Sequence, residues 1–411
     1  MVVYGMKFLL PLFFSLPIFA AEPEVLLVSP PELKSGWDEY VAMRAEQGTS
    51  MKLITTEQIA EDFEGSDIQE KIRLCVREHI DKHGYHTVIL GGDSSGAGGL
   101  IPDRDTYHHN LWGMEKDVPS DVYYISPTNW DYDGDGIYGE FEDDSEAIAY
   151  PDGSVAVGRI PVRTLEDIKA YAGKVSKHLD AEPIEQLGMT CAVRSAYAKV
   201  FRSGNKLIPE AWPNGAVSFF FSDITSWDDA DNRGAYDLNV ANLGEKFSTG
   251  EINKWHLHGH GLIDRWILEG DEAFDHDAVN SLKNKQPLVI TTVSCFTGQF
   301  DAEQDPSITE TMLRQPDGGA VLVVAPSRIG KPHFHNPRQD MRLMAYEGKL
   351  DGTTQTMTSF WLESLGAEKK NAGMALAGAK ASLADDSKQS AVYHQGMCEL
   401  NLLGDPTLPV R

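Results

Sequence analysis

Short apolar stretches alternate with amphipathic stretches of helical period along most of this chain, and this alternation restricts the fold more than any other feature. Residues 68–82 place Ile72, Val76 and Ile80 on one face of a predicted helix. The next stretch, residues 87–90, reads Thr-Val-Ile-Leu and runs into two glycines and an aspartate. A strand without polar alternation is typical of a parallel sheet covered on both faces. The sequence therefore predicts a mostly parallel sheet with helices on each side.

The same alternation extends over two regions of unequal size. Further strands are predicted near residues 25–28, 51–54, 155–161, 189–193, 217–221, 255–258, 288–293 and 320–325. Residues 102–151 are polar, aromatic and acidic, which predicts surface loops, and residues 180–186 have the composition of a linker. A chain of 411 residues is long for one core. We expect a first α/β subdomain over residues 21–180, including an acidic loop, and a larger one over residues 181–411.

The first twenty residues have the pattern of a secretory signal peptide. Lys7 precedes an apolar stretch from Phe8 to Phe19, and Ala20-Ala21 follow as a cleavage site. The stretch is too short for a membrane span, and no later stretch has the length and composition to cross a bilayer. Residues 1–20 are thus expected to be removed, leaving a secreted or periplasmic protein without membrane insertion.

Acidic residues dominate the charge of the chain. There are 62 Asp and Glu against 36 Lys and Arg, a formal net charge of −26. A field of this sign repels nucleic acid and anionic lipid, and it favours cations such as basic peptides or calcium. The four cysteines are widely spaced and form no Cys-x-x-Cys pair, which argues against a zinc knuckle or a thioredoxin-type motif. Whether Cys75, Cys191 and Cys398 pair stays open.

Two residues with nucleophile and base chemistry follow two predicted strands. His260 comes just after the strand near 255–258, and Cys295 comes just after the strand near 288–293. In parallel sheets, reactive groups gather at the carboxyl ends of the strands. An imidazole beside a thiol lowers the pKa of the thiol and transfers its proton. The amides of Gly261 and Cys295 could hold the oxyanion of an acyl-transfer intermediate. The alternative is that Cys295 is a small buried apolar residue and His260 is structural.

The histidines at positions 256, 258 and 260 offer a competing interpretation. On one strand they would share a face, and such a set can bind zinc. A zinc hydrolase is therefore a second hypothesis at this stage. No organic cofactor is indicated.

Residues 131–142 fit the pattern of a calcium-binding loop. The predicted ligands are the carboxylates of Asp131, Asp133, Asp135 and Glu142 and the carbonyl of Ile137. Gly136 permits the sharp turn that such a loop needs, and hard oxygen donors at this density suit calcium. Flanking helices are not evident, so a single structural calcium in an EF-like loop is expected. An acidic, solvated turn is the alternative.

The segments around the two candidate residues resemble the catalytic core of the gingipain family of cysteine peptidases, in the caspase-like clan. The resemblance rests on His258-Gly259-His260-Gly261 with Trp266 and on the segment from Thr292 to Asp301. Further segments recur in the same order: Val88 to Asp93, Ser120 to Tyr124, Val157 to Pro161 and Leu403 to Leu408.

The resemblance carries implications for fold and function. It implies a caspase-like three-layer α/β/α sandwich with mostly parallel sheets and two subdomains, the larger one carrying both catalytic residues. It implies a cysteine endopeptidase acting on protein or peptide substrates, with His260 rather than His258 as the acid/base. Asp121 falls where arginine-specific members place the acid that binds the P1 side chain, which favours Arg or Lys at P1. A transpeptidase-like acyl transfer, or an inactive member that serves as a binding or secretion module, remains an alternative.

Overall fold

The computed structural model describes residues 24–94, 99–110, 113–144, 148, 152–191, 216–221, 236–268, 272–303, 306–330, 353–366, 368 and 370–411. The predicted signal peptide, residues 1–20, lies outside the described residues. In the part of the chain that is described, no helix combines the length and the apolar character needed to cross a membrane.

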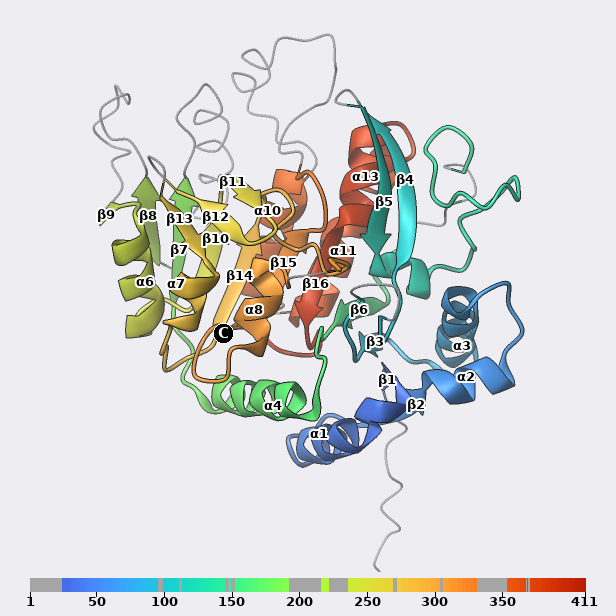
Figure 1. Cartoon of the computed structure of the whole chain (residues 1–411), viewed down its shortest axis with the longest axis horizontal. Helices are drawn as coiled ribbons and strands as arrows, with labels where there is room; N and C mark the ends of the chain where they lie inside the picture. Colours follow the sequence, from blue (N-terminus) through green and yellow to red (C-terminus); the bar gives the residue numbers. More distant parts are fainter. Residues whose placement is uncertain are drawn as a thin grey trace, which may run out of the picture.

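One large sheet runs through the whole molecule (Figure 1). Its strand order is β2-β1-β3-β6-β16-β15-β14-β10-β7-β8-β9. The strands are β1 (Val25–Ser29), β2 (Met51–Thr55), β3 (Thr87–Leu90), β6 (Ala156–Arg159), β7 (Gln186–Cys191), β8 (Ala216–Phe221), β9 (Tyr236–Asp237), β10 (Lys254–Leu257), β14 (Leu288–Thr292), β15 (Ala320–Pro326) and β16 (Leu400–Gly404).

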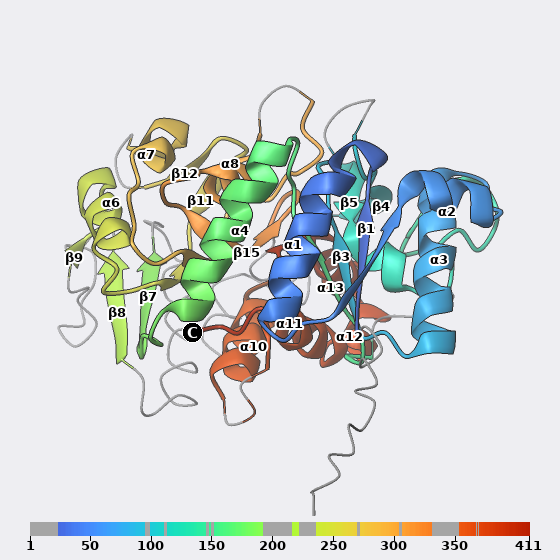
Figure 2. The same cartoon turned by 90° about the horizontal axis from the view of Figure 1, so that it is seen from below.

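Helices cover both faces of this sheet. Figure 2 shows α1 (Lys34–Glu46) and α4 (Leu165–Asp180) on one side, and α10 (Thr353–Leu365), α11 (Ala372–Ala381) and α13 (Ala391–Glu399) on the other. The other helices in the described residues are α2 (Thr56–Asp62), α3 (Ile68–His83), α6 (Val240–Thr249), α7 (His276–Asn280), α8 (Ile308–Arg314) and α12 (Ala384–Ser387). Every residue of β14 and β15 is buried, as expected for strands covered on both faces. The predicted α/β/α layering is confirmed.

The sheet consists of two parallel halves that run in opposite directions. All neighbouring strands pair in parallel except β15 and β16, which are antiparallel. The predicted subdomain boundary near residue 180 falls between α4 and β7, yet both halves belong to one sheet. Strand β16, from the last residues of the chain, joins them by pairing with β6 and β15. The carboxyl ends of the two halves therefore lie at opposite edges of the sheet.

The prediction that residues 102–151 are surface loops is wrong for the first part of that segment. Strands β4 (Arg104–Asn110) and β5 (Gly113–Ser120) form an antiparallel hairpin, and a 3-10 helix, η2 (Asp121–Ile125), follows with every residue buried. The hairpin buries polar side chains, among them Thr106, His108 and Ser120. Because its buried positions are not apolar, the alternation that identifies a strand is absent from the sequence.

Candidate active site

The strands that precede the two candidate residues are neighbours in the sheet. Strands β10 and β14 pair in parallel, with Leu257 opposite Thr292. The pairing continues one residue further, since the amide of Val293 donates to the carbonyl of Leu257 at 3.2 Å. Both strands thus end at the same edge, as the sequence predicted. His260 and Cys295 follow them within three residues of the strand ends.

The segment that carries His260 lies directly against the turn that carries Cys295. Strand β11 (His260–Leu262) begins a small antiparallel sheet with β12 (Arg265–Ile267) and β13 (Ala273–Asp275). A Cβ atom added to Gly261 would lie 2.6 Å from Thr297 Cγ2 and 2.9 Å from the Cys295 carbonyl oxygen. The backbone at 261 therefore contacts the Cys295 turn so closely that only glycine fits. His260 is exposed and Cys295 is half-buried, so both face solvent rather than separate cores.

Trp266 fixes this small sheet to the large one. The indole is 2% exposed, and its Nε1 donates to Thr292 Oγ1 at the end of β14, at 3.2 Å. Trp266 also pairs across the hairpin with Gly261. The tryptophan that follows the histidine in the sequence thus holds the histidine strand at the nucleophile strand.

Replacing Gly261 with alanine should disable the site while the fold persists. The new methyl group would have to displace the Cys295 turn, and a misplacement of about 1 Å can cost about 100-fold in rate. The free energy of unfolding should fall by roughly 1–3 kcal/mol, which is the usual cost of overpacking a site. The measurement is kcat/KM on a peptide substrate beside a urea unfolding curve.

Gly173→Ala is the matched control for that substitution. Gly173 lies in α4, and an added Cβ there meets nothing within 4 Å. This variant should keep full activity and gain stability slightly, because alanine favours helix. Equal activity of the two variants would contradict the close packing inferred at Gly261.

The Cys295 turn has a strained backbone that tertiary contacts hold in place. Phe296 has φ +61°, a left-handed conformation that is uncommon for a residue with a side chain. Its amide donates to the Arg328 carbonyl at 2.8 Å, and the amide of Gly298 donates to Pro326 at 3.0 Å. A strained backbone conformation persists only where many surrounding contacts hold it in place, and such conformations are common at functional turns.

Arg328 links this turn to the next acidic residue in the chain. Its guanidinium binds Asp301 with two bonds, of 2.8 and 2.6 Å, while its own carbonyl holds the Phe296 amide. Nη2 also donates to the carbonyl of Asp117 on β5. Asp301, the last residue of the cysteine segment, thus forms an ion pair with Arg328 beside the Cys295 turn. Arg328 was missed from the sequence because it lies after β15, far from the motif.

The three histidines of the zinc hypothesis occupy different environments. His256 is buried on β10 and hydrogen-bonds Thr291 Oγ1 through Nδ1 at 2.7 Å, and burial lowers its pKa to about 4. His258 is buried, whereas His260 is exposed on β11. Among the described residues, their donor atoms do not gather within reach of one ion. The zinc-hydrolase hypothesis is wrong because β10 ends at Leu257, so the exposed His260 on β11 does not share a face with the two buried histidines.

The sequence comparison assigns the family. A sequence model of Peptidase family C25 matches residues 20–411. The chain belongs to peptidase family C25. It is therefore a cysteine-type peptidase of the gingipain kind, as the cysteine and histidine segments predicted.

Solved structures agree with this assignment at the level of the fold. Gingipain R (RgpB), an Arg-specific cysteine proteinase, is similar with a TM-score of 0.65 and 16% identity, over 95% of this chain and 78% of that chain. The complex of the Porphyromonas gingivalis RgpB pro- and mature domains gives a TM-score of 0.64 and 16% identity, over 94% and 80%. At such identities the similarity shows a common fold. A search of curated proteins found no match.

Asp121 does not present a free carboxylate in this C25 peptidase. The side chain is 2% exposed, and Arg159 binds it through Nε at 2.9 Å and Nη2 at 2.6 Å. Arg159 is itself completely buried and also donates to the carbonyls of Gly92 and Ile101. The prediction that Asp121 binds a substrate side chain is corrected, because its charge is already compensated inside the fold.

A cavity beside the β4–β5 hairpin has several acidic residues of the C25 peptidase in its wall. It has a volume of about 340 Å³, and its wall includes Asp103, Asp105 and Asp117. Asp105 is accessible from the cavity, yet dehydration by the surrounding protein, followed by repulsion from Asp103 and Asp301, raises its pKa to about 7. Crowded carboxylates of this kind are stabilised by a cation.

The acidic loop of the C25 peptidase gathers three of its four predicted carboxylates. Oxygens of Asp131, Asp133 and Asp135 lie within 4.8 Å of one another, whereas Glu142 is outside this group and exposed. The amide of Ile137 donates to Asp135 Oδ1 at 2.7 Å. Gly134 and Gly136 have φ of +79° and +84°, which explains the need for glycine in this turn.

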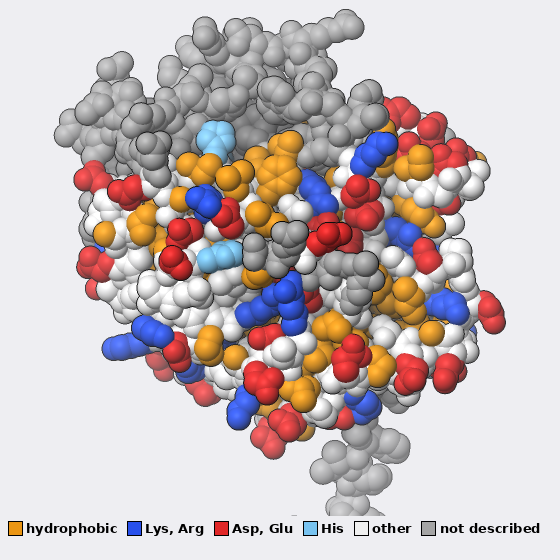
Figure 3. Space-filling view, viewed as in Figure 1, with side chains coloured by type: hydrophobic (Ala, Val, Ile, Leu, Met, Phe, Trp, Pro, Cys, Tyr) orange, Lys and Arg blue, Asp and Glu red, His pale blue; other side chains and the backbone are white. Residues whose placement is uncertain are grey.

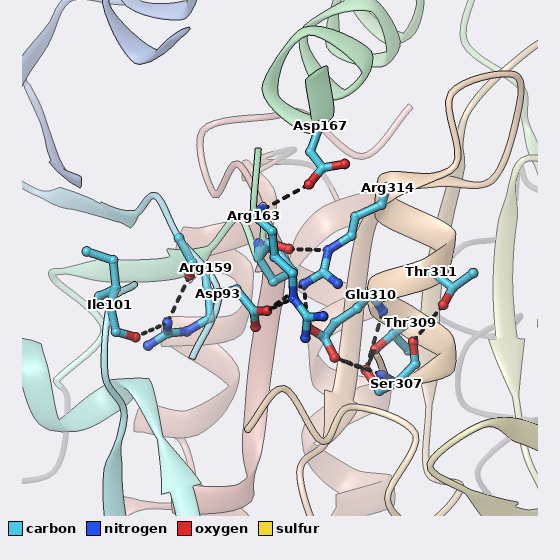
Figure 4. A network of polar contacts seen from close by, with 12 residues as sticks. Asp93, Ile101, Arg159, Arg163, Asp167, Ser307, Thr309, Glu310, Thr311 and Arg314 are labelled. Atoms are coloured by element: carbon cyan, nitrogen blue, oxygen red, sulfur yellow. Dashed lines mark hydrogen bonds and ion pairs between the residues drawn. The ribbon is translucent and has the colours of Figure 1, made fainter. Parts of the chain in front are cut away.

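A partly buried polar network connects α8 to the segment that follows β3. Figure 4 shows its members, which are Asp93, Arg163, Glu310 and Arg314. Arg314 lies between the two acids, 3.1 Å from Asp93 and 2.8 Å from Glu310. Next to Glu310 in α8, Thr309 donates to the carbonyl of Thr297 at 2.8 Å. The network thus joins the end of β3 to the helix that contacts the cysteine turn.

Proposed function

We propose that this C25 peptidase is an exported endopeptidase that uses Cys295 as nucleophile and His260 as proton-transfer partner. The observation that supports this most strongly is the contact of Gly261 with the Cys295 turn at the common end of β10 and β14. A dyad is recognised by assembled roles rather than by distance along the chain. Export is supported by the signal pattern of residues 1–20.

The proposed reaction is acyl transfer to water. His260 takes the proton of the Cys295 thiol, and the thiolate attacks the peptide carbonyl carbon. The Gly261 and Cys295 amides stabilise the oxyanion that forms. The C–N bond then breaks as His260 gives the proton to the leaving amine, which leaves a thioester on Cys295. Water, deprotonated by His260, hydrolyses the thioester and restores the thiol.

A preference for Arg or Lys at P1 is part of the proposal, with a different acidic partner from Asp121. The acidic cavity is joined to the cysteine turn, because Arg328 contacts both Phe296 and Asp117. A cationic side chain in that cavity would relieve the repulsion around Asp105. Acidic side chains are also spread over the face shown in Figure 3, with basic ones among them, so the overall field favours basic substrates.

A peptide-library cleavage screen tests the function and the preference together. Matched peptides with Arg, Lys, citrulline or Leu at P1 are incubated with the wild type and with Cys295→Ala. We expect cleavage by the wild type alone, after Arg or Lys, with citrulline poorly cleaved because it lacks the charge. Cleavage after Leu and citrulline at the rate for Arg would contradict the preference, and no cleavage would contradict the function.

We also propose that the acidic loop binds one structural calcium ion. The convergence of Asp131, Asp133 and Asp135 and the glycine turns between them support it. Carboxylate oxygens at this density are typical calcium ligands. Bound calcium would rigidify a loop whose Ile137 and Tyr138 line the acidic cavity.

Removal of calcium should therefore lower the stability of the protein. A ligand at 100 times its Kd stabilises the folded state by about 2.7 kcal/mol, so chelation should lower the thermal midpoint and added calcium should restore it. Asp133→Asn should weaken this response, whereas Asp143→Asn, an exposed acid beside the loop, should not. An unchanged midpoint on chelation, or equal effects of both variants, would count against the site.

A further inference from the structure

A second group of metal-ligand side chains lies in the interior, away from the cysteine turn and the acidic loop. It consists of His108 on β4 and of His394 and Cys398 on α13. One ring nitrogen of each histidine and the cysteine sulfur all lie within 4.8 Å of one another. The three side chains are buried, with 2%, 0% and 1% exposed. We propose that His108, His394 and Cys398 bind a zinc ion.

The fold brings these three residues together from distant parts of the chain. His394 and Cys398 are four positions apart on α13 and therefore lie on the same face of the helix. Helix α13 packs against the β4–β5 hairpin, and the ring centroids of His108 and His394 are 5.1 Å apart. Two imidazoles and a thiol are also the ligand types that zinc binds most often.

One ring nitrogen of each histidine is held by an oxygen atom. His394 Nε2 donates to the carbonyl of Gly139 at 2.7 Å. His108 Nε2 lies 2.8 Å from Thr106 Oγ1, and that hydroxyl donates to the Val118 carbonyl at 2.9 Å. A metal ligand typically uses one ring nitrogen for the ion while the other is held by an oxygen.

Zinc binding would change the protonation of one ligand. A thiol binds zinc as a thiolate, so formation of a bond between the ion and the Cys398 sulfur would release the thiol proton to solvent.

The proposed site would connect the β4–β5 hairpin to helix α13. Helix α13 leads directly into β16, the strand that joins the two halves of the sheet. The hairpin carries Asp117, whose carbonyl binds Arg328 beside the cysteine turn. The ion would thus stabilise the hairpin that Arg328 connects to the cysteine turn. This inference does not depend on the proposed peptidase activity.

The test uses the full chain in a Cys295→Ala background, which removes the half-buried thiol of the candidate active site and any self-cleavage. Native mass spectrometry and titration with zinc should show one zinc per chain, distinct from calcium. Titration with cobalt(II), a probe for zinc sites, should give a thiolate-to-cobalt absorption band. Cys398→Ser should weaken zinc binding by more than about tenfold and abolish the band. Loss of a residue that only hydrogen-bonds a metal ligand already weakens metal binding by about tenfold or more.

Cys75→Ser is the matched control. Cys75 is also buried, has a pKa raised to about 12 and lies 3.8 Å from a single histidine nitrogen, of His79. The Cys75→Ser variant should bind zinc as tightly as the Cys295→Ala parent protein does. His394→Gln, which keeps a side-chain N–H for Gly139, should lose binding as Cys398→Ser does, with the far-ultraviolet circular dichroism unchanged. The proposal is overturned if the parent binds no stoichiometric zinc, or if Cys398→Ser binds as tightly as Cys75→Ser.

Discussion

Alanine in place of Cys295 should reduce peptide hydrolysis by at least about 10⁴-fold, since loss of a catalytic nucleophile is among the most costly changes an enzyme can suffer. The thiol is half-buried in a turn at the surface, so its removal leaves little cavity. The free energy of unfolding should therefore change by less than about 1 kcal/mol. The measurement is kcat/KM for the best library peptide, with unfolding curves of both proteins.

Two further variants separate nucleophile loss from general damage. Cys75→Ser removes a thiol that lies in the core of the first half, and it should keep kcat/KM within about twofold of the wild type at a cost in stability. His260→Ala should lose activity nearly as completely as Cys295→Ala, because the two act as a unit. If the wild type cleaves no peptide, and Cys295→Ala binds a partner protein as tightly as the wild type does, the binding-module alternative is favoured.

The protein should lose much of its stability between about pH 6.5 and pH 4. His178 and His256 are buried, and burial is the main cause that lowers the pKa of each to about 4. In the unfolded chain both take up a proton near pH 6.5. Between these values the unfolded state binds more protons than the folded state, so stability falls as the pH falls. Each histidine should account for about 3 kcal/mol, a large share of a typical folding free energy.

Urea unfolding at pH 7.0, 5.5 and 4.0 measures this loss. His178→Gln is the informative variant, since His178 Nε2 lies 2.8 Å from the Pro409 carbonyl and a glutamine amide can still donate to it. Because glutamine does not titrate, the variant should lose about 3 kcal/mol less than the wild type over the same range. Parallel pH profiles for the two proteins would show that His178 is not a source of the acid sensitivity.

The sequence predicted the parts of the fold that local patterns record. Apolar strands such as β14 and β15 are identifiable because they are buried on both faces, and the α/β/α layering follows from their alternation with helices. The position of His260 and Cys295 after two such strands was also readable, and the pairing of β10 with β14 confirmed that these ends are adjacent. The family segments added His260, rather than His258, as the proposed base.

Contacts between distant residues could not be read in this way. Asp121 looked like a substrate-binding acid until the structure showed Arg159 bound to it. The β4–β5 hairpin was taken for loops because it buries polar side chains, such as Thr106 and His108, which contact each other at 2.8 Å. The ion pair between Arg328 and Asp301 leaves no local pattern in the sequence, because the two residues follow different strands.

What the sequence by itself determined is the set of strands and helices, the edge of the sheet where chemistry would occur and the residue types available there. Only the tertiary structure decided which charges are already paired, how the C-terminal strand β16 joins the two halves, and that two histidines and a cysteine meet in the interior. The physical reason is that hydrophobic periodicity records whether a position is buried, whereas the partner of a buried polar group is fixed by packing between segments far apart in the chain.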